Sequence, residues 1–173
     1  MSYKKYGIAF VFAFNLFSLN VWADVTVNIF STQTNQKIGT ITFQDTLSGL
    51  LITPNLHGLS PGQHGFHVHV NPSCEKSGQS AGNHLDPTNT QQHRGPYQTD
   101  GHLGDMPSLY VDQQGVANKP ILAPRLHESD MYGHALVIHA GSDNFLDVPK
   151  PLGGGGDRIA CGVIPASQHF STP

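Results

Sequence analysis

Histidine is the residue type in this sequence with the clearest chemical potential. The chain has 173 residues and 11 histidines, three of which fall within "GQHGFHVHV", residues 62–70. His67 and His69 alternate with valine, and residues two apart on a β-strand point to the same face. Both imidazoles could therefore approach one metal ion, although the same pattern also suits two polar side chains on the solvent face of a sheet.

A long segment without apolar periodicity, 71–107, carries further candidate ligands. Its motifs "AGNHLDP", "HRGP" and "GHLGD" contain His84, His93, His102 and Asp105. The segment has few apolar residues with which to order itself by burial, whereas a bound metal can order such a loop. Three imidazoles and one carboxylate suit zinc, and an all-imidazole set suits copper. We therefore expect at least one metal site.

The elements that must position these residues are predicted to be short strands. Alternation of apolar and polar residues over 25–30 is typical of a half-buried strand, and 37–43 completes a hairpin with it. The full set of candidate strands is 25–30, 37–43, 47–56, 65–70, 108–112, 134–140 and 158–164. His139 ends one of them and could meet the histidines of 65–70. The sequence predicts a single all-β domain, an antiparallel sandwich or barrel with two long loops, 71–107 and 141–157.

The first 23 residues differ from the rest. Lys4 and Lys5 precede an apolar run that ends with Val21 and Ala23 at the small positions of a cleavage site, the pattern of a secretory signal peptide. The run is short for a membrane span of about 20 residues. We expect residues 1–23 to be cleaved, the domain to occupy 24–173, and the exported protein to have no stable membrane association.

Charge and cysteine content restrict the possible partners. Without Lys4 and Lys5 the chain has 9 − 2 = 7 basic residues and 12 acidic ones, a formal charge of −5. No basic stripe exists, so nucleic acid is not expected as a partner. The two cysteines, Cys74 and Cys161, form an even pair in an exported protein and indicate a disulfide rather than two buried thiols. Closing so long a loop would stabilise the fold by about 4–5 kcal/mol in the chain-entropy model.

Six motifs in order resemble those of copper/zinc superoxide dismutases, especially exported bacterial members. They are "GFHVH", "AGNHLDP", "HRGP", "GHLGD", "HALVIHAG" and "GGGGDRIACGVI", and they extend over nearly the whole chain after residue 23. The resemblance implies an eight-stranded antiparallel Greek-key β-barrel. It also implies one copper and one zinc ion per subunit, superoxide as the substrate and the periplasm as the location.

The resemblance also implies a role for each matching residue. Copper would be bound by His67, His69, His84 and His139, and zinc by His84, His93, His102 and Asp105. His84 would be shared by the two metals and would carry a proton during turnover. Asp143 would link a copper-bound histidine to a zinc-bound one, Arg158 would attract and orient the anion, and Cys74 would be bonded to Cys161.

Two questions stay open at this point. A non-enzymatic copper/zinc-binding protein on the same scaffold is the alternative to a dismutase that protects the cell envelope. The presence of all seven ligand residues together with Arg158 favours the enzyme. A homodimer is the expected assembly, although exported members of the family occur as monomers too. His64, beside the metal-binding motif, has no assigned role.

Overall fold

The computed structural model describes residues 25–166, so the expected signal peptide, 1–23, lies outside the described residues. In the described part, nine strands and three short 3-10 helices occur, and none of the helices is long and apolar enough to span a membrane. The strands are β1 (Val25–Ser31), β2 (Lys37–Thr46), β3 (Gly49–Leu56), β4 (Gly62–His64), β5 (Phe66–His69), β6 (Leu109–Val111), β7 (Ile121–Ala123), β8 (Ala135–His139) and β9 (Arg158–Val163).

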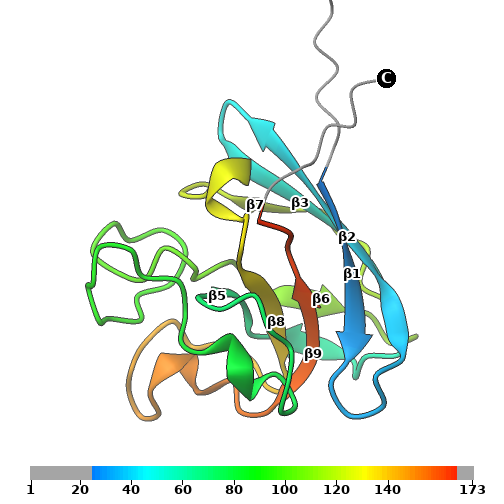
Figure 1. Cartoon of the computed structure of the whole chain (residues 1–173). Coiled ribbons are helices and arrows are strands. Elements are labelled where there is room, and N and C mark those ends of the chain that lie inside the picture. The colour runs from blue at the N-terminus through cyan, green and yellow to red at the C-terminus, as the bar shows by residue number, and fades with distance from the viewer. Residues whose placement is uncertain (1–24, 167–173) are drawn as a thin grey trace, which may run out of the picture.

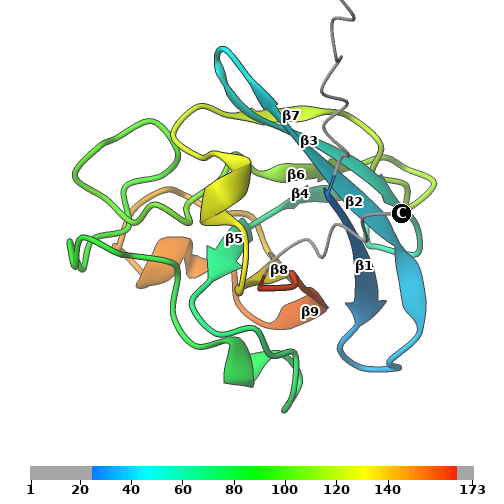
Figure 2. The same ribbon diagram turned by 45° about the horizontal axis from the view of Figure 1, so that its top comes forward.

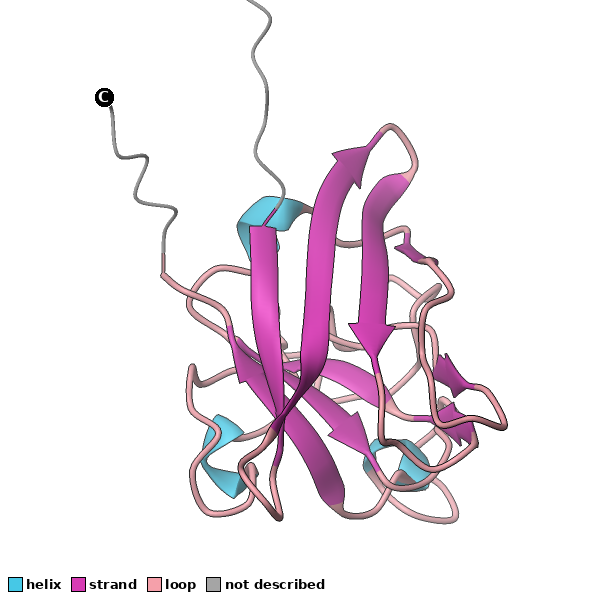
Figure 3. Cartoon of the chain, turned by 90° about the vertical axis from the view of Figure 1, so that its right-hand side faces the viewer, coloured by secondary structure: helices cyan, strands magenta, loops and turns pink. Residues whose placement is uncertain are grey.

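The first three strands form an antiparallel meander along one side of the molecule (Figure 3). Alternation in β1 buries Val25, Val27 and Ile29 and leaves the residues between them facing outward. These side chains join a core that contains Phe43 and Phe66, both fully buried. Burial of one face of each strand is therefore what holds the meander against the rest of the barrel.

The strands form a curled antiparallel sheet in the order β5-β8-β9-β1-β2-β3-β7, and β4 pairs with β6 in a second, two-stranded sheet (Figures 1 and 2). Residues 62–69 change partner at Gly65, because β4 pairs with β6 whereas β5 pairs with β8. The Gly65 N–H donates to the Gly141 carbonyl at 2.8 Å, and its carbonyl accepts from the His139 N–H at 2.8 Å. One continuous segment therefore links the two sheets.

Two long loops lie together beside β5 and β8 (Figure 1). One joins β5 to β6 and contains the helix η1 (Gln79–Ala81), and the other joins β8 to β9 and contains η3 (Leu152–Gly154). The third short helix, η2 (Glu128–Asp130), precedes β8. The meander β1–β3 contributes no residue of the metal-ligand clusters described below. The functional groups therefore gather on one side of the barrel.

The all-β antiparallel fold predicted from the sequence is confirmed, and so are the hairpin and the two long irregular loops. Two short strands were not predicted. β4 lies between the expected strands 47–56 and 65–70, and β4 and β7 are each only three residues long. The expected strand 65–70 corresponds to β5, and the seven expected strands together with β4 and β7 account for the nine strands of the described residues.

Candidate metal centre

Backbone pairing brings histidines from the strands and the long loop together. His69 lies opposite His84, and His67 lies opposite Asp105, each in an isolated antiparallel bridge on one edge of β5. The other edge of β5 pairs with β8, whose last residue is His139. The loop is therefore paired locally like an extra strand. This pairing places its side chains on the same face as His67 and His69.

Four of these side chains make one cluster. One ligand atom from each lies within 4.8 Å of those of the others, and all four residues are buried: His67, His69, His84 and His139. The cluster includes one buried nitrogen per ring that lacks a hydrogen-bond partner, namely Nδ1 of His67 and Nε2 of His69, His84 and His139. A buried polar atom without a partner costs about 1–3 kcal/mol, and four neutral imidazole nitrogens form a donor set that suits copper.

The other nitrogen of each ring is held by the protein, which fixes the tautomer and the ring orientation. The acceptors are Asp143 Oδ2 for His67 Nε2 at 2.7 Å, the Gly82 carbonyl for His69 Nδ1 at 2.9 Å, Asp105 Oδ1 for His84 Nδ1 at 2.9 Å, and the Gly156 carbonyl for His139 Nδ1 at 3.0 Å. Each ring is thus oriented so that its free nitrogen points into the cluster.

Burial keeps the rings of the four-histidine cluster neutral. Because this donor set suits copper, His67, His69, His84 and His139 are called the copper-side histidines below, and the histidines around Asp105 the zinc-side histidines. Burial lowers the pKa of His67 to about 3 and of His139 to about 4, and it lowers the pKa of His69 well below its usual value. The charge of nearby His84 acts in the same direction for all three rings. A neutral imidazole is the form that binds a metal, so these rings need lose no proton to bind copper at neutral pH.

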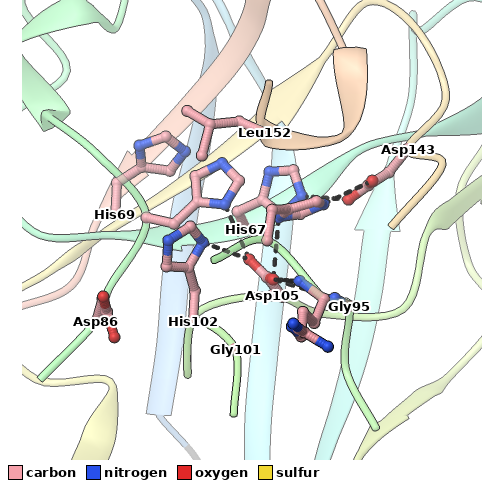
Figure 4. Close-up of polar contacts among 12 residues, drawn as sticks. His67, His69, Asp86, Gly95, Gly101, His102, Asp105, Asp143 and Leu152 are labelled. Carbon is pink, nitrogen blue, oxygen red and sulfur yellow. Dashed lines mark hydrogen bonds and ion pairs between the residues drawn. The ribbon is translucent and has the colours of Figure 1, made fainter. Parts of the chain in front are cut away.

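Asp105 gathers a second group of imidazoles. Its carboxylate lies 2.9 Å from Nδ1 of His84, 2.9 Å from Nδ1 of His93 and 3.5 Å from Nδ1 of His102. Figure 4 shows the contact between His102 and this carboxylate as a dashed line. Burial alone would raise the pKa of Asp105, but the hydrogen bonds from the histidines hold it well below its usual range. Three nitrogens around an ionised carboxylate fit zinc.

The tightest grouping of ligand atoms around Asp105 contains His67 rather than His102, together with His84 and His93. Nε2 of His67 is bonded to Asp143, however, and its Nδ1 belongs to the copper-side set. Nδ1 of His102 is buried without a hydrogen-bond partner. His102 therefore has a ring nitrogen available for a metal ion beside Asp105, whereas both ring nitrogens of His67 belong to other contacts.

Asp143 connects the two groups of ligands. Its Oδ2 accepts from His67 at 2.7 Å and its Oδ1 lies 2.8 Å from Nε2 of His93 (Figure 4). Burial alone would lower the pKa of His93, but hydrogen bonds to Asp105 and Asp143 outweigh it and raise the pKa to about 9. Asp143 thus bridges His67 of the four-histidine cluster and His93, which also contacts Asp105.

Arg158 and the disulfide connect β9 to the long loop that joins β5 to β6. Arg158 donates to the Gly78 carbonyl and to the Gly82 carbonyl, each at 2.7 Å. Cys74 and Cys161 form a disulfide, as predicted, which joins positions 87 residues apart. Since Gly82 also accepts from His69, the arginine and a copper-side histidine share one carbonyl oxygen.

His64 has a role that the sequence did not reveal. Its ring is buried, and its Nδ1 lies 2.7 Å from the carbonyl of His139 while its Nε2 lies 2.8 Å from the carbonyl of Ser60. Its ring therefore fixes the main-chain carbonyl of His139, one of the copper-side histidines. No local signal in the sequence identifies this contact, because His139 is 75 residues away.

The glycine run 153–156 packs directly against the centre. A Cβ at Gly153 would collide with Asp143 Oδ1, and one at Gly155 would lie 2.9 Å from Cβ of His139. The absence of side chains in this run therefore lets the main chain approach the ligands. Beside it, Leu152 lies over the imidazoles in Figure 4. Leu152, His84 and His102 are among the residues that line an open hollow of about 540 Å³.

Comparisons with known proteins agree with this geometry. The family model for copper/zinc superoxide dismutase matches residues 37–164. A superoxide dismutase [Cu-Zn] from Photobacterium leiognathi is 46% identical over 160 residues, which cover 88% of this chain and 92% of that protein.

Two solved structures also resemble the chain closely. The Cu/Zn superoxide dismutase from Brucella abortus is 42% identical with a TM-score of 0.77, and the comparison covers 82% of this chain and 99% of that one. The monomeric copper, zinc superoxide dismutase from Salmonella enterica is 47% identical with a TM-score of 0.72 and the same coverage. The similarity spans both the barrel and the histidine-bearing loops, and the chain belongs to the copper/zinc superoxide dismutase family.

Proposed function

We propose that this protein is a superoxide dismutase that uses one copper and one zinc ion per subunit. In this proposal copper is held by His67, His69, His84 and His139, and zinc by His84, His93, His102 and Asp105. The observation that carries it is the set of four buried, unpartnered imidazole nitrogens that lie close together on the copper side, next to three imidazoles gathered around Asp105. Seven ligand residues with fixed orientations fit a preformed two-metal centre.

The reaction converts two superoxide anions and two protons to oxygen and hydrogen peroxide. Copper, when bound, supplies one-electron chemistry between its two oxidation states. Arg158 offers a positive charge beside the copper-side histidines, and this charge can attract an anion to a protein whose expected mature charge is −5. His84 presents Nδ1 to Asp105 and Nε2 to the copper side, so Nε2 is the atom at which a proton can be held for the product.

Metal reconstitution tests the proposal. The oxidised protein, stripped by a chelator and reloaded, should disproportionate superoxide only when copper is restored, and zinc alone should give no activity. A protein that holds both metals, keeps its disulfide and has no activity would instead favour the non-enzymatic metal-binding alternative.

Two histidine substitutions distinguish the loss of a metal ligand from general destabilisation of the fold. His84→Ala removes the side chain proposed as a ligand of both metals, so the variant should bind both copper and zinc more weakly. His57→Ala replaces an exposed histidine outside the clusters and should leave both metals bound. Metal content measured by mass spectrometry of the native protein distinguishes the two results, and equal metal content in both variants would argue against the assignment.

We further propose that residues 1–23 are a cleaved signal peptide, that the domain comprises 24–173, and that the protein works in the bacterial periplasm, where it protects the cell envelope. The bacterial relatives and the disulfide support export, because disulfides persist in oxidising compartments. The N-terminus of the protein isolated from cells should be Asp24. An intact N-terminus with Lys4 and Lys5 retained would contradict the proposal.

A homodimer is the assembly we propose. Large apolar side chains are partly exposed on β6, β7 and β9, at Tyr110, Leu122 and Val163, and such side chains can be covered in an interface. The description of the Salmonella enterica relative as monomeric shows that the alternative occurs in the family. Sedimentation equilibrium should give twice the subunit mass; a single-subunit mass at all concentrations would exclude the dimer.

A further inference from the structure

Arg125 lies outside the ligand clusters but contacts the main chain of one ligand. Its Nη2 donates to the Gly101 carbonyl at 3.0 Å and its Nη1 to the His102 carbonyl at 3.2 Å. We propose that Arg125 is a positioning residue for zinc: its guanidinium fixes the main chain of 101–102 and thereby aims Nδ1 of His102 at Asp105. This inference rests on the proposed membership of His102 in the zinc set.

His102 needs such support because neither nitrogen of its ring is hydrogen-bonded to a protein acceptor in the described part of the chain. Within residues 25–166, each of the other five histidines of the centre has one ring nitrogen hydrogen-bonded to a protein acceptor: His67, His69, His84, His93 and His139. The same set of hydrogen bonds includes none to the ring of His102, whose nearest ionic contact is the 3.5 Å approach to Asp105. Its orientation must therefore come from its backbone, since ring orientation is normally fixed by a partner on the second nitrogen.

The backbone of His102 is held on both sides. Its N–H donates to the Gln92 carbonyl at 2.9 Å, which belongs to the same irregular loop. Its carbonyl is held by Arg125, which reaches the loop from the barrel. Arg125 follows β7, and its neighbour Leu126 is buried and donates its N–H to the Ala123 carbonyl at 3.3 Å. Arg125 therefore fastens a loop that has few apolar contacts to a part of the molecule that is firmly packed.

The chemistry of the arginine side chain suits this role. A planar guanidinium can donate to two neighbouring carbonyls at once, whereas an ammonium group is a compact point charge. Among the described residues, no carboxylate forms a salt bridge with Arg125, so these carbonyls are the partners its donors have. Arg94, in the same loop, provides a contrast: its side chain is about half exposed and contacts the side chains of Gln92 and Asp100.

The test compares Arg125→Met with Arg94→Met in the full-length oxidised protein. Methionine keeps an unbranched apolar stem and removes every donor. The metal-free proteins are titrated with zinc against a chromophoric chelator, and with Co²⁺ to obtain a visible absorption spectrum from the zinc site. Arg125→Met should weaken zinc binding about 10–100-fold, the usual effect of losing a partner that orients a ligand, and should alter the Co²⁺ spectrum. Copper affinity should change less than about twofold, and Arg94→Met should match the parent in all three measurements.

Further variants make the result decisive. Arg125→Lys should recover part of the zinc affinity, because an ammonium group can still donate to one carbonyl. If Arg125→Met does not fold, the Co²⁺ spectrum of Arg125→Lys decides: a spectrum identical to that of the parent overturns the proposal, and an altered one supports it. Equal losses of copper and zinc affinity in Arg125→Met would indicate general loosening and would also overturn it.

His102→Ala separates this proposal from the assignment on which it rests. If His102→Ala binds zinc as tightly as the parent, the proposed zinc set itself is wrong. If His102→Ala loses zinc while Arg125→Met keeps it, the zinc set stands and the role of Arg125 is refuted.

Discussion

Each copper-side imidazole has one nitrogen engaged by the protein and one left free, and the free atom differs from residue to residue. It is Nδ1 at His67 but Nε2 at His69, although the two residues lie on the same face of β5. The difference follows from their partners, because Asp143 takes Nε2 of His67 while the Gly82 carbonyl takes Nδ1 of His69. H-x-H spacing predicts that the two rings share a face. It does not predict which nitrogen is free, since Asp143 is 76 residues from His67.

At this scale Arg158 gives the sharpest prediction for activity. Arg158→Ala should keep both metals but lower kcat/KM about tenfold or more at low ionic strength, because a positive charge near a site raises the encounter rate with an anion by roughly 10–1,000-fold. The remaining rate should also depend less on salt, since screening acts on the charge that has been removed. Stopped-flow measurement of superoxide decay over a range of salt concentrations checks both effects.

Arg158→Lys is the matched control for that prediction. Lysine keeps the charge but cannot reproduce the two 2.7 Å bonds to the Gly78 and Gly82 carbonyls. The Arg158→Lys variant should therefore retain most of the salt dependence. An unchanged kcat/KM in Arg158→Ala at low salt would show that the residue does not steer the substrate.

At the scale of elements, the loops contribute as much to the centre as the strands do. In β1 the strand can be predicted from the sequence because apolar burial repeats every second residue, whereas β5 and β8 are buried at every position. The change of strand partner at Gly65, from β6 to β8, could not be predicted from the sequence. It depends on hydrogen bonds to Gly141 and His139, which lie in a distant part of the chain, and a glycine between His64 and Phe66 does not reveal them.

Gly153 allows a prediction at the same scale. Gly153 and Gly156 have nearly equal φ angles of 73° and 74°, so alanine at either position meets a similar left-handed penalty of about 1 kcal/mol. Only at Gly153 would the added methyl group collide with Asp143 Oδ1, whereas nothing lies within 4 Å at Gly156. Gly153→Ala should therefore weaken zinc binding, whereas Gly156→Ala, which lies beside copper-side His139, should lower stability without weakening zinc binding.

Thermal unfolding of the metal-free proteins and zinc titration separate these two effects. Similar Tm values for the two variants together with weaker zinc binding in Gly153→Ala would support the contact with Asp143. Equal zinc affinities would indicate that the loop relaxes to accommodate the methyl group and that the close approach is not required.

At the scale of the whole molecule, the buried ligands make the metal-free protein sensitive to pH. His67 and His139 have pKa values of about 3 and 4 in the folded state against 6.5 in the unfolded state. Below pH 6.5 the unfolded chain therefore binds more protons, and the free energy of unfolding falls as pH is lowered from 6.5 through 4 to 3. Asp105 and Asp143, whose pKa values are lowered, add to this loss in acid.

His93 acts in the opposite direction. Its folded pKa is raised to about 9, so its contribution is fully present below pH 6.5 and is lost as pH rises through 9. The stability of the metal-free protein should thus be greatest near pH 6.5. Urea unfolding followed by circular dichroism across this range measures the curve, and a stability that rises steadily up to about pH 9 would contradict it.

The meander β1–β3 contributes nothing to the ligand clusters, and this has a practical consequence for protein engineering. The turn between β2 and β3 carries Leu47, which is fully exposed and belongs to neither of the two long loops. A peptide tag or reporter inserted between Leu47 and Ser48 would extend from the barrel without displacing a ligand or either long loop. The barrel could thereby serve as a carrier whose cargo and whose chemistry are modified independently.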